Sequence, residues 1–340
     1  MRFIQTIACA ALLAAAHAHA ADLTIGIDDV KAAGAGYQSI KIPRQDGAAI
    51  QIDVWYPSRT PVAKQNMGVI TQEVAMGGEV QGNELPLIVF SHGTGSFGLG
   101  HYDTALALAN AGFVVAALTH PGDNHADQSR SVDVLARPKH IIEVIDYMLA
   151  TWKGREVLAP SRIGIFGFSA GGFTALVNIG GMPDLSLVSK HCKTNPSDFA
   201  CTLLSANKDQ LQQIPRFATK DMHDVRIRAA VIAAPALGFT FSSGGLNDVD
   251  IPVQLWRAED DVLLPHPWYA EAVRTSLRKE PDYHSVASAG HFDFLAPCSE
   301  KLLSLAPQIC TSKDGFDRES FHRRFNSAVV AFFIKSLSPT

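Results

Sequence analysis

The sequence lacks a cluster of basic residues, and it lacks a long apolar run beyond its N-terminal segment. Its 340 residues include 29 Lys and Arg against 33 Asp and Glu, which gives a formal net charge of −4. Without a basic block, neither nucleic acid nor an anionic membrane surface is an expected partner. A membrane-spanning helix needs about 20 consecutive apolar residues. No such run follows the N-terminal segment, so the sequence predicts no transmembrane segment.

Cysteine is scarce, and the spacing that is typical of structural zinc sites is missing. The chain has five cysteines, and none of them stands in a Cys-x-x-Cys pair. Asp123 and His125 lie close together in the sequence, but no further ligand accompanies them at a suitable spacing. The sequence therefore predicts neither a bound metal ion nor metal-assisted catalysis.

Residues 1–20, MRFIQTIACAALLAAAHAHA, have the pattern of a secretory signal peptide. The single charge of Arg2 precedes an apolar run that ends in small residues typical of a cleavage site. We expect cleavage before Ala21 and export to the periplasm or the medium. The mature chain, 21–340, is then long enough to form one α/β domain with a large core.

Four cysteines remain in the mature chain, and an even number in an exported protein favours disulfides. We expect the cysteines nearest in sequence to pair, because short loops close at the smallest entropic cost. Crossed pairings and free thiols are the alternatives. The expected disulfides are Cys192–Cys201 and Cys298–Cys310.

Apolar runs alternate with helix-forming segments along most of the chain. Residues 37–57 predict a hairpin around a QDG turn, and 58–84 predict a long surface loop. The alternation that follows is typical of the α/β class, with a mostly parallel, doubly wound sheet covered by helices on both faces. The later expected strands are 85–90, 113–118, 162–168, 226–235, 252–258 and 283–289; the expected helices are 104–112, 138–152, 170–180, 268–278 and a closing helix marked by Phe321, Phe325, Val329, Phe332 and Phe333.

Residues 181–224 interrupt this alternation. They are polar, and they lie between the helix that follows Ser169 and the next expected strand. We interpret them as a small, mainly helical cap inserted over the sheet. The alternative is an excursion on the side of the domain that plays no part in substrate entry.

The segment 162–176, RIGIFGFSAGGFTAL, places Ser169 at the junction of an expected strand and an expected helix. Gly167 and Gly171 flank it in the pattern G-x-S-x-G, which is the nucleophile elbow. The backbone is strained at the Ser of such a turn, and the two glycines avoid clashes there. The turn raises the hydroxyl above the sheet, at the N-terminus of a helix.

A nucleophilic Ser needs a base to take its proton and an acid to orient that base. Ligands of such sheets bind at the carboxyl ends of the strands, so the candidates are the residues that follow the strands. His291 follows the last expected strand, and Asp261 follows the strand before it. His284 is a rival base at the start of its strand, and Asp260 is an alternative acid. We predict that Ser169, Asp261 and His291 form the catalytic triad, in the order typical of this fold.

The oxyanion of an acyl-transfer intermediate needs backbone N–H donors. We predict Ala170, directly after the nucleophile, and Thr94, in the glycine-rich loop HGTG that follows the strand 85–90. A plain glycine-rich turn is the alternative interpretation of that loop. His92, His120 and Trp256 are possible pocket residues, although structural hydrogen bonds and packing explain them as well.

With these motifs, the chain resembles the α/β-hydrolase superfamily over nearly all of its mature length. More narrowly, residues 85–124 are similar to the platelet-activating-factor acetylhydrolase group and to bacterial proteins known as predicted dienelactone hydrolases. VWYP at 54–57 and GHFDF at 290–294 share that similarity.

The resemblance implies an esterase with a Ser-His-Asp triad, no cofactor, and oxyanion donors at Thr94 and Ala170. True dienelactone hydrolases use a Cys nucleophile, where this chain has Ser169. A dienelactone is therefore not an expected substrate.

These observations together predict an exported serine hydrolase that cleaves a small-molecule or lipid-like carboxylic ester. A serine peptidase or amidase would use the same triad, and a non-catalytic binding protein of the same fold is a third possibility. No charged pocket residue is evident, so neither a cationic nor an anionic substrate is favoured. The sequence predicts no particular oligomeric state.

Overall fold

This computed structural model of the chain describes residues 34–211, 219–242 and 244–339. The expected signal peptide, residues 1–20, lies outside the described residues. Within the described ranges, no helix is both long and apolar enough to cross a membrane.

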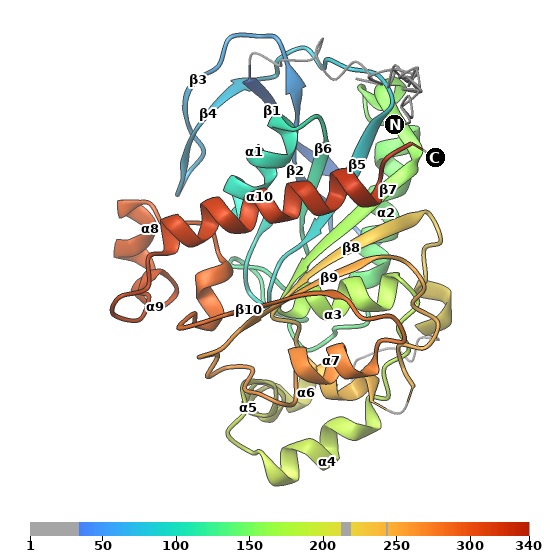
Figure 1. Ribbon diagram of the computed structural model, residues 1–340, viewed down its shortest axis with the longest axis vertical. Coiled ribbons are helices and arrows are strands. Elements are labelled where there is room, and N and C mark those ends of the chain that lie inside the picture. Colours follow the sequence, from blue (N-terminus) through green and yellow to red (C-terminus); the bar gives the residue numbers. More distant parts are fainter. Residues whose placement is uncertain (1–33, 212–218, 243, 340) are drawn as a thin grey trace, which may run out of the picture. The chain divides into compact units, whose positions relative to one another are not determined.

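A single ten-stranded sheet runs through the described part of the chain, with helices on both of its faces (Figure 1). Its strand order is β10-β9-β8-β7-β5-β6-β2-β1-β4-β3. The strands β6, β5, β7, β8, β9 and β10, which are adjacent in this order, pair in parallel. The strand β2 is antiparallel to both β1 and β6. The predicted α/β class is therefore confirmed. The strands are β1 Gly34–Ile42, β2 Ile50–Ser58, β3 Ala63–Asn66, β4 Thr71–Met76, β5 Leu85–Ser91, β6 Val114–Thr119, β7 Leu158–Phe168, β8 Ile227–Ala233, β9 Val253–Ala258 and β10 Asp282–Val286.

The prediction of a surface loop over 58–84 is wrong, because this segment contains β3 and β4. β4 pairs with β1 in parallel and with β3 in antiparallel fashion. Its polar residue Gln72 is buried and accepts a hydrogen bond from the indole N–H of Trp55 at 2.8 Å. The partner that makes this strand favourable thus lies on β2, so the composition of 58–84 does not reveal it.

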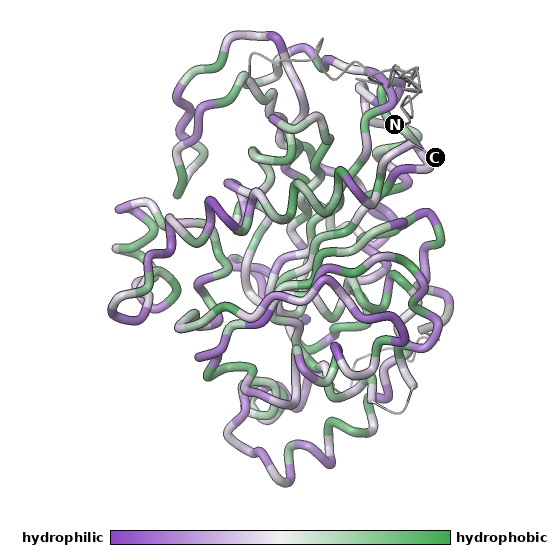
Figure 2. Tube along the Cα trace, viewed as in Figure 1, coloured by the Kyte–Doolittle hydropathy of each residue, from purple (hydrophilic) through white to green (hydrophobic). Residues whose placement is uncertain are grey.

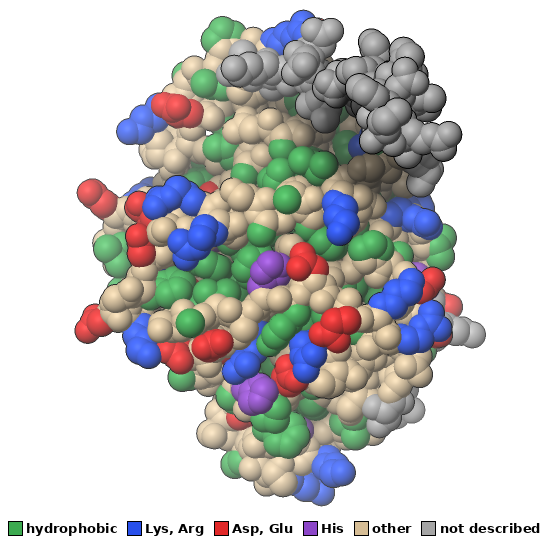
Figure 3. Space-filling model, viewed as in Figure 1, with side chains coloured by type: hydrophobic (Ala, Val, Ile, Leu, Met, Phe, Trp, Pro, Cys, Tyr) green, Lys and Arg blue, Asp and Glu red, His purple; other side chains and the backbone are tan. Residues whose placement is uncertain are grey.

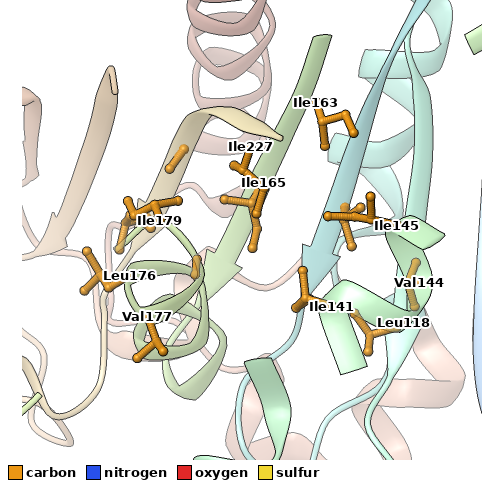
Figure 4. Close-up of a cluster of buried hydrophobic side chains, with 14 of the residues drawn as sticks. Leu118, Ile141, Val144, Ile145, Ile163, Ile165, Leu176, Val177, Ile179 and Ile227 are labelled. Atoms are coloured by element: carbon orange, nitrogen blue, oxygen red, sulfur yellow. The ribbon is translucent and has the colours of Figure 1, made fainter. Parts of the chain in front are cut away.

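Helices α1 and α10 cover one face of the sheet, and α2 and α3 cover the other. The buried apolar side chains form two clusters, one with α2 and α3 and one with α1 and α10. Figure 4 shows side chains of the first cluster between the helices α2 and α3 and the central strands. The helices are α1 Tyr102–Asn110, α2 Arg137–Ala150, α3 Ala170–Asn178, α4 Ser186–Thr194, α5 Phe199–Ala206, α6 Lys208–Leu211, α7 Ala270–Ser276, α8 Glu300–Leu305, α9 Pro307–Cys310 and α10 Arg318–Ser336.

The closing helix α10 is amphipathic, as its phenylalanine stripe predicts. Figure 2 shows hydrophobic and hydrophilic positions alternating along it. Its buried residues at the predicted spacing bind it to the sheet, whereas its other side faces solvent. The apolar residues of this stripe are Phe321, Phe325, Val329, Phe332 and Phe333.

The two disulfides lie outside the central sheet. Cys192 of α4 is joined to Cys201 of α5, and Cys298 is joined to Cys310 of α9. This is the pairing that short loop closure favours.

The face shown in Figure 3 carries cationic and anionic side chains interspersed with one another, in keeping with the near balance of charges in the sequence.

Candidate active site

Ser169 lies in a sharp turn between β7 and α3. Its φ of 55° and ψ of −119° place a residue with a side chain in a strained region of the backbone map. The flanking glycines allow this turn: a Cβ added at Gly167 would overlap the carbonyl of Gly171, and one added at Gly171 would overlap the carbonyl of Ser91. The strand β7, the helix α3 and the end of β5 thus approach more closely than any larger residue permits.

The structure brings the three predicted triad residues together. Ser169 Oγ lies 3.0 Å from Nε2 of His291, and Nδ1 of His291 lies 2.7 Å from Oδ2 of Asp261. Asp261 Oδ1 accepts the backbone N–H groups of Leu263 and Leu264 at 3.0 and 2.8 Å. An anchored carboxylate that accepts the Nδ1 proton leaves the Nε2 lone pair directed at the hydroxyl. The arrangement can therefore take the Ser169 proton.

The rival acid and base lie elsewhere. Asp260 is half-exposed and forms an ion pair with Lys313 at 2.6 Å. His284, in the middle of β10, lies 3.1 Å from a carboxylate oxygen of Asp282, and its ring stacks on Trp256. The geometry therefore favours Asp261 and His291 over these alternatives.

Both expected oxyanion donors lie beside the nucleophile. Ala170 is the first residue of α3, and Thr94 lies in the loop that follows β5. Thr94, Ser169 and Ala170 line the same cavity. At the start of α3 the aligned peptide dipoles also favour negative charge.

A buried ion pair holds the loop that contains Thr94. The guanidinium of Arg137 lies 2.5 Å from Asp123, and it also donates to the main-chain carbonyl of His92. The other oxygen of Asp123 accepts the backbone N–H of Gly95 at 2.9 Å. The ion pair thereby holds the backbone on both sides of Thr94, at His92 and at Gly95. Burial lowers the pKa of Arg137, and the adjacent Asp123 acts in the opposite direction.

Sequence reasoning missed this ion pair. In the sequence Asp123 is recognisable only as a possible metal ligand, and Arg137 stands at the start of an amphipathic helix, where its partner cannot be recognised. Within the residues that the structure describes, no group of three His, Cys, Asp or Glu side chains is arranged to hold a metal ion.

His92 and His120 are not pocket residues; the structure buries both behind the Thr94 loop. Nε2 of His92 accepts the backbone N–H of His120 at 3.0 Å, and its Nδ1 therefore donates to the carbonyl of Gly93 at 2.7 Å. His120 contacts the hydroxyl of Ser91 and Nδ1 of His140, at 2.9 and 3.1 Å. Burial lowers the pKa of His92 and of His120, and it lowers that of His140 to about 3. These imidazoles serve as neutral hydrogen-bonding groups.

Trp256 is also not a pocket residue. Its indole packs between His284 and Phe325, and its N–H donates to Gln254 at 2.9 Å. It therefore belongs to the apolar cluster on the α10 side of the sheet. The side chains of successive residues on β9 alternate between the two faces of the sheet, and that of Trp256 points to this side.

Two cavities open beside Ser169. The first, which we call the α4–α5 cavity, has a volume of about 480 Å³. The second, the α8–α9 cavity, has a volume of about 660 Å³. Volumes of this order are typical of small-molecule sites. Thr94, Ser169 and Phe199 line both of them.

Comparison with known proteins agrees with this architecture. Residues 31–144 match the family model described as platelet-activating factor acetylhydrolase, isoform II. The solved ferulic acid esterase from Streptomyces cinnamoneus superposes with a TM-score of 0.61 at 19% sequence identity, over 89% of this chain and 90% of that chain. The chain has the α/β-hydrolase fold. No curated protein sequence matches it.

The family match confirms the resemblance over the first part of the α/β-hydrolase domain. It includes the loop with Thr94 and the residues Asp123 and Arg137 that hold it. It ends before Ser169, Asp261 and His291, so the assignment of these three residues depends on their geometry in this chain.

Proposed function

We propose that this protein is an exported serine hydrolase that cleaves carboxylic esters through an acyl-enzyme intermediate. The observation that carries the proposal is the continuous hydrogen-bonded chain from Asp261 through His291 to Ser169. The strained backbone at Ser169 supports it as well, because such strain is concentrated at functional sites. The two disulfides support the export of the chain, since they persist in oxidising compartments.

The proposed reaction begins when Ser169 Oγ attacks the ester carbonyl carbon and its proton passes to Nε2 of His291. The carbonyl oxygen becomes an oxyanion, which the backbone N–H groups of Thr94 and Ala170 stabilise. Asp261 stabilises the imidazolium. The intermediate collapses, the bond to the alcohol oxygen breaks, and that oxygen takes the proton from His291.

Deacylation repeats these steps with water. His291 takes a proton from water, the hydroxide oxygen attacks the acyl carbon, and the carboxylic acid leaves as Ser169 regains its proton. Each oxyanion donor contributes about 3 kcal/mol to such a transition state. The mechanism uses no group beyond these side chains, the two backbone donors and water.

Hydrolysis of p-nitrophenyl esters by variants tests the proposal. Ser169→Ala and His291→Ala should each lower kcat/KM by at least about 10⁴-fold. Ser327→Ala, on the exposed side of α10, is the matched control and should leave the rate unchanged. Parallel assays with the matching anilides compare esters with amides. A Ser169→Ala variant as fast as the parent protein would refute the proposal.

A further inference from the structure

The two cavities meet at the nucleophile but are lined by different parts of the machinery. Ala170, one of the two oxyanion donors, lines the α4–α5 cavity. His291 lines the α8–α9 cavity and is not among the residues that line the other one. Phe199 of α5 stands at the boundary and lines both.

This division assigns each cavity to one half of an ester. When the tetrahedral intermediate collapses, the alcohol oxygen must lie within hydrogen-bond reach of the imidazolium that protonates it. The alcohol half therefore extends past His291, into the α8–α9 cavity. The carbonyl oxygen lies toward Ala170 and Thr94. The acyl chain is left with the remaining direction, into the α4–α5 cavity.

The α4–α5 cavity is lined by apolar side chains over most of its surface, and the disulfide Cys192–Cys201 forms part of its wall. Among the residues that the structure describes, Lys208 is its one charged lining residue, and no carboxylate lines it. An acetyl group would leave most of the apolar wall without a partner. The aliphatic lining residues include Val132, Val134, Leu185, Val188, Leu203, Leu204, Leu237 and Leu264.

The α8–α9 cavity has a more aromatic and a more polar lining. Phe97, Phe168 and Phe292 contribute aromatic side chains to the lining, and His125 and Gln308 add polar groups. Leu305 of α8 and Ile309 of α9 also line it. Such a lining suits an alcohol with an apolar or aromatic body and a few polar substituents.

We infer that the preferred substrate is an ester of an apolar acyl chain longer than acetyl, with the chain in the α4–α5 cavity and the alcohol in the α8–α9 cavity. This inference rests on the proposed function. It differs from the acetyl specificity in the name of the family that residues 31–144 match. The acyl side gives the sharper prediction, because its lining is mostly aliphatic.

Two substrate series test the assignment. With p-nitrophenyl esters from acetate to octanoate, kcat/KM should rise by up to about fourfold per methylene, the equivalent of about 0.8 kcal/mol, until the cavity is filled. With butyrate esters of methyl, hexyl and benzyl alcohols, the apolar and aromatic alcohols should react faster than the methyl ester.

A matched pair of variants separates the two cavities. Leu204→Trp narrows the α4–α5 cavity and should abolish the preference for octanoate over acetate, with acetate hydrolysis retained. Leu305→Trp makes the same replacement in the α8–α9 cavity and should leave the acyl preference unchanged while it reduces hydrolysis of benzyl butyrate. If each variant affects the opposite series, the assignment is reversed and the inference fails.

Labelling with a small fluorophosphonate distinguishes failure of the inference from failure of the proposed function. A parent protein that labels at Ser169 and hydrolyses acetate best would overturn the acyl-chain assignment alone. A folded parent protein that neither labels nor hydrolyses any ester would overturn the proposed function and the inference with it. Labelling of both Trp variants shows that they retain an intact site.

Discussion

Arg137 and Asp123 form a buried ion pair that holds the Thr94 loop from both sides. Nη1 of Arg137 lies 2.5 Å from Oδ2 of Asp123, and the side chains of both residues are almost fully buried. Arg137 Nε also donates to the hydroxyl of Thr174 on α3 at 3.2 Å, which links the loop to the helix that begins at Ala170. One ion pair thus sets the relative position of the two expected oxyanion donors.

Asp123→Asn should therefore lower kcat more than it changes KM. The variant leaves the guanidinium of Arg137 buried without its counter-charge, and loss of one oxyanion donor typically costs about 10²- to 10³-fold in kcat. Breaking a buried pair also costs about 3 to 5 kcal/mol of folding free energy. Steady-state kinetics and urea unfolding measure the two effects.

The control for this prediction is Arg278→Ala, which removes an exposed pair with Asp250. Exposed pairs contribute about 0 to 1 kcal/mol, so stability and kcat should stay close to those of the parent protein. An Asp123→Asn variant that is folded and has unchanged kcat would show that the ion pair does not position the donors.

Gly171→Ala should destabilise the protein and abolish activity, because the added Cβ would overlap the carbonyl of Ser91. Overpacking of this kind typically costs about 1 to 3 kcal/mol. Gly315→Ala is the comparison: its φ of 83° is unfavourable for Ala, but no described residue other than its two chain neighbours has an atom within 4 Å of the added Cβ. Thermal unfolding of both variants separates overlap from backbone strain. Equal losses would contradict the close approach at the elbow.

The stability of the fold should decrease as the pH falls below about 6.5, in part because of His101. Burial lowers the pKa of this imidazole from its ordinary value to about 3. In that interval the unfolded chain binds a proton at His101 and the folded protein does not. Acid therefore favours the unfolded state, and the contribution to stability is present above the unfolded pKa and lost as the pH falls towards the folded one.

His101→Phe replaces the imidazole between Phe166 and Phe168 with an apolar ring. The number of protons taken up on unfolding between pH 4 and 6 should fall by about one. Urea unfolding at several pH values gives this number from the slope of the unfolding free energy. An unchanged slope would mean that His101 is protonated in the folded state.

Removal of either disulfide should affect one cavity and not the other. The pair Cys192→Ser and Cys201→Ser unlinks α4 from α5 and should weaken the preference for long acyl chains. The matched pair Cys298→Ser and Cys310→Ser should alter the selectivity for alcohols. Each closes a short loop, so each removal should cost about 3 kcal/mol of stability. Identical selectivity changes in the two variants would contradict the separate roles of the cavities.

The convergence of Ser169, Asp261 and His291 could be predicted from the sequence because each of these residues follows a strand. Parallel strands end at the same edge of the sheet, so Ser169 after β7, Asp261 after β9 and His291 after β10 were expected to converge. The G-x-S-x-G pattern also fixed the turn type at Ser169. These are properties of local sequence and chain order, which need no knowledge of long-range packing.

Features that depend on distant partners could not be predicted. Gln72 is buried in β4 because Trp55 of β2 donates to it, and the Thr94 loop is fixed by Arg137 of α2. Trp256 was a possible pocket residue because it lies shortly before Asp261 in the sequence, but the alternation of side chains on β9 directs it to the apolar cluster that packs against α1 and α10. The long-range packing of strands and helices, which the sequence does not display, decides between these outcomes.

The most direct measurement is peptide mapping of the parent protein after reaction with a fluorophosphonate, which reacts covalently with an activated Ser. The account predicts one equivalent of label per chain, located on Ser169, and much slower labelling of His291→Ala. Label on another residue, or none on folded protein, would contradict it.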